Sequence, residues 1–148
     1  MEESISRKSE DKVVELLARK LDVKFKNEPF PHQEWGKPDK WAQLSPNKYL
    51  LLEVEERQAH PDTNVLKVWP YLRENRKAQI FLIQAFFPKR DNRNISRKLL
   101  SEWTGHELEK RFPKRFRYCK INISDDKKKI DKSKLRHYSY LHKEVDDE

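Results

Sequence analysis

Apolar and polar residues follow two different periods along this chain, and this separates predicted helices from predicted strands. Apolar side chains recur at helical spacing over residues 9–21, with Ser9 as the expected N-cap. Residues 49–55, 79–87 and 116–123 are dense in apolar and aromatic side chains, which predicts strands. The segment 79–87 is apolar nearly throughout, as expected for a strand covered on both faces.

Two more helices follow from local signals. One should begin at His60, with Pro61 at its first position, and run to about Trp69, where Pro70 kinks or ends it. The other should cover residues 91–111, with Gly105 as a point of interruption. Its inner side is expected to carry Ile95, Leu99, Leu100, Trp103 and Leu108.

Between these elements, residues 23–26 form a short candidate strand, and residues 38–41 are either a strand edge or a turn. The order is then helix, strands, helix, strand, helix, strand. Helices mixed with a central sheet predict an α/β fold.

Length and composition limit the class of protein. The 148 residues suit one domain, expected at 1–123, followed by a charged tail or extension at 124–148. Cys119 is the single cysteine, so no internal disulfide can form, and it suits a buried strand position. The N-terminus lacks a secretory apolar segment, and no apolar run is long enough to span a membrane. We therefore expect a cytoplasmic protein.

Positive charge is concentrated in one stretch. The net charge is +8, and residues 89–120 contribute +7 of it, with 11 Lys/Arg against 4 Asp/Glu. Such a stretch is either a solvated basic helix or a surface that binds nucleic-acid phosphates. The candidate phosphate-binding side chains here are Lys89, Arg90, Arg93, Arg97 and Lys98.

Two acids share one face of the predicted strand 49–55. Glu53 and Glu55 lie two residues apart, about 7 Å between Cα atoms, and repel each other unless a cation lies near. A bound Mg²⁺ would supply it, since this ion prefers carboxylate oxygens. The alternative is that the strand end is simply exposed. Asp39 could be brought beside Glu53 by a hairpin, or could belong to an ordinary Pro-Asp turn.

The predicted helices add further polar candidates. His60, Asn64 and Lys67 share one helix face and could contact phosphate, unless this is an ordinary exposed face. On the first helix, Glu10 lies on the apolar face, and Glu15 lies roughly opposite. Glu10 is therefore the candidate acid from this helix, although an acid in a first turn also compensates the helix dipole.

This pattern resembles the PD-(D/E)xK nuclease superfamily, which has the restriction-endonuclease-like fold. The motif reads Pro38-Asp39, thirteen intervening residues, then Glu53-Val54-Glu55. The resemblance covers about residues 9–123 and implies an αβββαβ core, with a mixed central sheet flanked by helices. Residues 58–69 also look like the helix that follows the motif strand in some members.

The resemblance implies a function and a set of roles. Asp39 and Glu53 would be metal ligands in a Mg²⁺-dependent endonuclease, with Mn²⁺ as a substitute ion. Glu55 departs from the motif, which usually has lysine there, and would be a further ligand or would orient a water. Lys67 would supply the missing positive charge, and Glu10 could join the metal ligands. The expected partner is nucleic acid, DNA ahead of RNA, and cutting both strands symmetrically would favour a homodimer.

Two other classes of protein remain open from the sequence. A nuclease fold without activity would still bind nucleic acid, and the absent motif lysine favours this alternative. A protein-interaction module could use the tryptophans Trp35, Trp41 and Trp69, although such residues commonly anchor a core. With only two glycines, a glycine-rich phosphate loop is excluded, and the histidines lack zinc-site spacing with cysteine.

Overall fold

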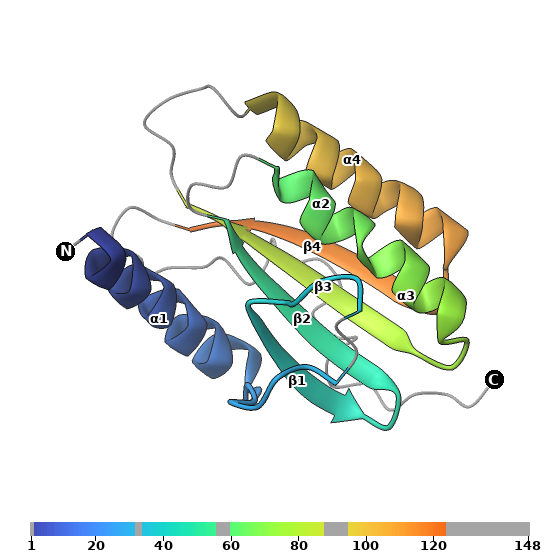
Figure 1. The fold of residues 1–148 in the computed structure, drawn as a ribbon, viewed down its shortest axis with the longest axis horizontal. Coiled ribbons are helices and arrows are strands. Elements are labelled where there is room, and N and C mark those ends of the chain that lie inside the picture. The colour runs from blue at the N-terminus through green and yellow to red at the C-terminus, as the bar shows by residue number, and fades with distance from the viewer. Residues whose placement is uncertain (1, 32–33, 56–59, 88–94, 124–148) are drawn as a thin grey trace.

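The computed structural model describes residues 2–31, 34–55, 60–87 and 95–123, which form a four-stranded mixed sheet between helices (Figure 1). Strands β1 (Lys40–Ser45) and β2 (Lys48–Glu55) make an antiparallel hairpin. Strands β3 (Gln79–Phe86) and β4 (Phe116–Asn122) continue the sheet in parallel, in the order β1-β2-β3-β4. The predicted α/β class is confirmed, and the apolar strand β3 lies between two neighbours as expected.

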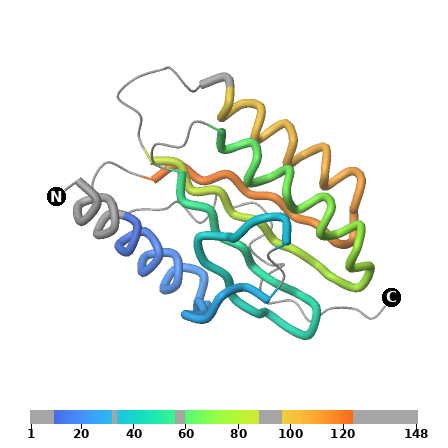
Figure 2. Tube along the Cα trace, viewed as in Figure 1, coloured from blue at the N-terminus to red at the C-terminus, as the bar shows by residue number. Residues whose placement is uncertain are grey.

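Helices cover both faces of this sheet. Helix α1 (Glu2–Leu21) packs on one face, while α2 (Pro61–Leu66), α3 (Val68–Glu74) and α4 (Ile95–Arg111) pack on the other (Figure 2). Alternate residues of β2 therefore enter different cores. The α1 core includes Val13, Leu17, Leu21, Leu50, Leu52 and Val54. The opposite core includes Tyr49, Leu51, Val65, Val68, Leu72 and Leu108.

Two expectations for the first part of the chain are wrong. Helix α1 begins at Glu2, so Ser9 lies inside the helix and is not its N-cap. Residues 23–26 do not form a strand. The Lys26 N–H donates to the Trp41 carbonyl at 2.8 Å, but this hydrogen bond does not extend into a ladder beside β1. Periodicity over four residues is too short to distinguish a strand from an extended connection.

Pro70 shapes the helix pair that follows β2. Helix α2 begins as predicted, with His60 as N-cap and Pro61 at the first position, and it ends at Leu66. A proline has no N–H to donate to the carbonyl four residues earlier, and its ring collides with that carbonyl. For Pro70 that residue is Leu66, so the break comes one turn before the proline rather than at it. Lys67 occupies the junction between α2 and α3.

The buried face of α4 differs from the prediction. Leu108 is buried, but Leu99 and Trp103 are each 61% exposed and Leu100 is 40% exposed; the side chain of Ile95 lies outside the described part. Ser101 and Gly105 face the sheet instead. Gly105 does not interrupt α4, because a glycine is needed there. A Cβ at Gly105 would lie 2.4 Å from Cγ of the buried Tyr118. Close packing on a tyrosine therefore selects small residues for the inner face.

Gly105→Ala is expected to lower the free energy of unfolding by about 1–2 kcal/mol. Alanine favours the helix by about 1 kcal/mol over glycine, whereas overpacking a filled core typically costs about 1–3 kcal/mol. The upper part of that range, about 2–3 kcal/mol, applies here because the added carbon would lie within 2.7 Å of three atoms of a ring held between sheet and helix. Urea unfolding measures the change. Thr104→Ala, on the neighbouring and more exposed position, is the control and should change stability by less than about 0.5 kcal/mol. An unchanged or raised stability of the Gly105 variant would contradict this packing.

Among the described helices, none is long and apolar enough to cross a membrane. Cys119 is buried, as predicted. The expected tail at 124–148 lies outside the described residues.

Candidate active site

Asp39 lies beside Glu53 because of the β1–β2 hairpin. Lys40 pairs with Leu52 in this antiparallel ladder, so the residue before β1 comes level with Glu53. One carboxylate oxygen of Asp39 (Oδ2) accepts a hydrogen bond of 2.7 Å from the backbone N–H of Val54. The hairpin expected from the sequence is therefore present, and it fixes Asp39 at the carboxyl end of β2.

Glu53 is a buried acid with a cationic partner. Its side chain is on the α2–α3 face of the sheet and is 1% exposed. The Lys67 ammonium lies 2.6 Å from its Oε1 atom. Burial raises the pKa of Glu53 well above its ordinary value, the Lys67 charge opposes this shift, and Asp39 and Glu55 add to it. The expectation that these acids might be simply exposed at a strand end is wrong.

Glu55 is buried next to Glu53, with only one of its oxygens hydrogen-bonded. Its Oε1 accepts from the Asn64 amide at 2.7 Å, while Oε2 is buried without a hydrogen-bond partner among the described residues. Burial raises the pKa of Glu55 to about 7; the Asn64 hydrogen bond and the Gln84 amide lower it, and the charge of Asp39 raises it. A buried acceptor without a donor is costly, so this oxygen favours uptake of a proton or a cation.

Lys67 reaches the acids from the junction between α2 and α3. Its three ammonium hydrogens match three acceptors, which are Glu53 Oε1 at 2.6 Å, the Lys37 carbonyl at 2.9 Å and Asn64 Oδ1 at 3.2 Å. Gly36 lies against the lysine stem: a Cβ there would be 3.0 Å from Lys67 Cδ, and its φ of +133° favours glycine. The loop before β1 and the helix pair together hold Lys67 over the acids.

A second buried polar group, missed in the sequence, supports the site from β3. Gln84 pairs with Glu53 in the ladder and is fully buried. Its amide donates to the Pro61 carbonyl at 3.0 Å, and its oxygen accepts from the Tyr118 hydroxyl at 2.5 Å. The one signal was a glutamine inside the otherwise apolar run 80–87. Gln84 therefore anchors the start of α2, and with it Asn64 and Lys67, to the sheet.

The other predicted site residues are less central. His60 is exposed, and its carbonyl accepts from the backbone N–H of Thr63 at 3.2 Å. Asn64, expected to contact phosphate, instead bonds Glu55 and Lys67. Glu10 is half-buried on α1, which packs on the opposite face of the sheet from Glu53 and Glu55. Its place among the metal ligands stays a prediction.

The basic stretch is only partly described. Lys89, Arg90 and Arg93 lie outside the described residues. Arg97 is 45% exposed and lies 3.6 Å from an Asp62 oxygen. Lys98 donates to Asn122 Oδ1 at 2.7 Å, and its ammonium lies 5.0 Å from the centre of the Phe86 ring. Both cations are thus on α4 near the carboxyl ends of the parallel strands, the same edge of the sheet as the acids.

The acids fit a hard divalent cation in chemistry and charge. Asp39, Glu53 and Glu55 offer carboxylate oxygens, which Mg²⁺ prefers, and Glu55 Oε2 accepts no hydrogen bond from the described part of the chain. When all are ionised, three carboxylates and the Lys67 ammonium sum to a charge of −2, which one divalent ion would balance. Within the described ranges, no group of three or more His, Cys, Asp or Glu side chains is already spaced to hold a metal. Binding would therefore require the acids to turn toward one ion.

Comparison of the chain with protein-family models, with curated proteins and with solved structures finds no match. The case for function therefore rests on the residues of the chain itself.

Proposed function

We propose that this protein is a metal-dependent nuclease that hydrolyses phosphodiester bonds, with DNA as the expected substrate. One observation carries the proposal: Asp39, Glu53 and Glu55 converge at one strand end, and Lys67 reaches them from the next helix. A lysine from a neighbouring element stands in for the motif lysine that Glu55 replaces. This arrangement is what the resemblance to the PD-(D/E)xK superfamily implies for an active member.

The fold supports the resemblance from β1 onward. The motif acids lie on a hairpin, a helix pair follows, and two parallel strands joined by α4 complete the sheet. The expected first strand of the αβββαβ core, residues 23–26, is an extended connection next to Trp41. We therefore include the restriction-endonuclease-like fold in the proposal, and its support is the hairpin β1–β2 that holds the acids and the elements that follow it.

Each residue of the site has a distinct task in this proposal. Asp39 and Glu53 hold the cation, and Glu55 is a further ligand or orients the attacking water. The bound cation supplies Lewis-acid chemistry, lowering the pKa of a water and balancing charge on the phosphate. Lys67 contributes a fixed positive charge where negative charge develops on the phosphate. Arg97 and Lys98 lie where they can hold the backbone, a contact that is independent of base sequence.

The second candidate is a nucleic-acid-binding protein without catalysis. The ion pair favours this candidate, because Lys67 already neutralises Glu53. All three hydrogens of the Lys67 ammonium are also donated to acceptors within the chain. A purely structural ion pair in this place would show no response to Mg²⁺ or Mn²⁺. The catalytic alternative is favoured by the Glu55 oxygen that has no hydrogen-bond partner among the described residues, and by the negative charge that the three acids carry when all are ionised.

A cleavage assay separates the two candidates. Purified protein is incubated with plasmid DNA and with structured RNA, in Mg²⁺, Mn²⁺ or EDTA, with Glu53→Ala beside the wild type. We expect metal-dependent cleavage by the wild type and a loss of at least about 100-fold in the variant, since a ligand and a buried charge are removed together. Intact substrates with the wild type, or equal cutting by both proteins, would contradict the assignment.

A further inference from the structure

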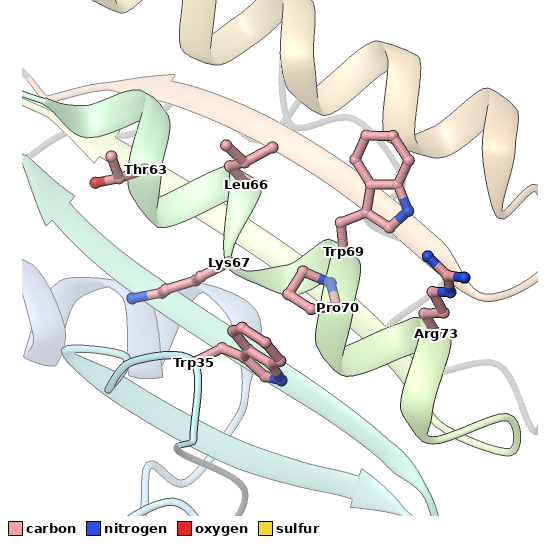
Figure 3. A pocket seen from close by; sticks show the side chains of 7 residues that line it. All are labelled: Trp35, Thr63, Leu66, Lys67, Trp69, Pro70 and Arg73. Carbon is pink, nitrogen blue, oxygen red and sulfur yellow. The ribbon is translucent and has the colours of Figure 1, made fainter.

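A cleft next to the acids is lined by two tryptophans. It has a volume of about 470 Å³, within the roughly 300–1,000 Å³ common for small-molecule sites. Its walls come from the loop before β1 and from the helix pair α2–α3 (Figure 3). The lining residues are Trp35, Thr63, Leu66, Lys67, Trp69, Pro70 and Arg73.

Lys67 joins this cleft to the candidate active site. Its stem lines the cleft (Figure 3). Its ammonium is 2.6 Å from Glu53. A group bound in the cleft would therefore contact the same lysine side chain that pairs with the acid. If the acids act on a phosphate, the cleft is placed to hold the nucleotide attached to it.

The surface of the cleft combines aromatic rings with positive charge. Trp35 is 49% exposed, and its indole N–H donates to Glu74 at 3.3 Å, which orients the ring. The Arg111 guanidinium lies 4.9 Å from the centre of the Trp69 ring, and Arg73 lines the cleft nearby. Exposed aromatic faces bind bases by stacking, and guanidinium groups bind phosphates.

We propose that this cleft binds an unpaired nucleobase of the substrate strand, stacked on Trp35, with its phosphate directed toward Lys67. This inference rests on the proposed function and narrows its substrate. A base inside a duplex is stacked on both sides and is not available to a protein ring, so the cleft selects single strands or sites with unpaired bases. Lys67 is already paired with Glu53. The guanidinium groups of Arg73 and Arg111, however, add positive charge at the cleft, which matches the charge of a strand rather than that of a neutral apolar partner.

Binding in EDTA tests the cleft without any cleavage. The probe is a short fluorescein-labelled oligothymidylate, compared by anisotropy with the same strand carrying abasic residues, which keeps the phosphates and removes the bases. Trp35→Ala should weaken binding of the thymine strand about 5- to 150-fold, the range for one stacked base, and leave abasic binding nearly unchanged. Trp35→Phe should retain most of the affinity. Trp103→Ala is the matched control, because Trp103 is as exposed but lies on α4 and does not line the cleft.

Three results would overturn the proposal. Trp35→Ala could bind the thymine strand as the wild type does, it could lose equal affinity for both strands, or Trp103→Ala could lose as much. Sedimentation of the same variants covers a further case: if only Trp35→Ala converts a dimer to a monomer, with oligonucleotide binding unchanged, the cleft is an interface between two copies of the chain. A base-dependent loss without any metal-dependent cleavage would instead retain the cleft and refute the nuclease proposal.

Discussion

Lys67→Met is expected to lower the free energy of unfolding at pH 8 by about 3–5 kcal/mol, the range for removing one partner of a buried ion pair. Glu53 is 1% exposed, and the Lys67 ammonium is the cation in contact with it among the described residues. Without it, Glu53 must either stay charged in a buried place or take up a proton. Urea unfolding in EDTA measures the loss.

A double variant separates this electrostatic cause from lost packing. Lys67→Met with Glu53→Gln removes both charges while keeping similar shapes, so it should regain a large part of the lost stability. If the double variant is no more stable than Lys67→Met alone, the stability comes from the packing of the lysine stem against Gly36 and the cleft, and not from the ion pair.

Glu55→Gln should make the protein more stable, and increasingly so as the pH rises. The carboxyl of Glu55 has a pKa of about 7 in the folded protein, against about 4.5 for an ordinary glutamate, because burial disfavours its charged form. Between these values the folded protein holds one proton more than the unfolded chain, so the free energy of unfolding falls as the pH rises and levels off above 7. Glutamine has no such titration.

The difference in stability between Glu55→Gln and the wild type should therefore grow by about 2–3 kcal/mol from pH 5 to pH 8 in metal-free buffer. Urea unfolding at several pH values provides the curve. Glu15→Gln, at an exposed position of α1, is the control and should run parallel to the wild type. A parallel curve for Glu55→Gln as well would show that Glu55 titrates like an exposed acid.

The strands and the pairing of the acids were accessible from sequence because both depend on local patterns. An apolar run as short as 79–87 is typical of a covered strand, and the alternation in 49–55 places Glu53 and Glu55 on one face. The hairpin that joins Asp39 to Glu53 was one of two alternatives in the sequence, and the β1–β2 pairing decides between them. The tasks of Asp39, Glu53, Glu55 and Lys67 in catalysis stay predictions.

The buried faces of the helices were harder to predict from the sequence, because the packing of neighbouring side chains decides which residues are buried. The hydrophobic pattern of α4 favoured Leu99 and Trp103 as its inner face, but Tyr118 leaves no room for a side chain at Gly105, and the buried residues of α4 include Ser101 and Leu108. Hydropathy records how apolar a residue is and not how much space its neighbour takes. For Gln84 the error was the opposite, because a polar residue is buried. Its amide is satisfied by hydrogen bonds to groups that are distant in the sequence, and hydropathy does not record such bonds.

The resemblance named Lys67 as the cation of the site, and the helix face grouped it with His60 and Asn64, but neither placed its ammonium against Glu53. Its actual position depends on Pro70, which ends α2 at Leu66, and on the loop carbonyl of Lys37, which is thirty residues earlier in the chain. Neither contact has a periodic signature. Glu53 and Glu55 could therefore be paired from the strand alone, whereas the contact of Lys67 with Glu53 required the fold.

Direct titration with Mn²⁺ at pH 8, followed by calorimetry or by the electron paramagnetic resonance signal of the free ion, tests the central claim that Asp39, Glu53 and Glu55 form a divalent-metal site. We expect the wild type and Glu15→Gln to bind Mn²⁺, and Asp39→Asn and Glu53→Gln to lose at least about tenfold in affinity. A folded wild type that binds no Mn²⁺ at millimolar concentration, or acid variants that bind as tightly as the wild type, would contradict it.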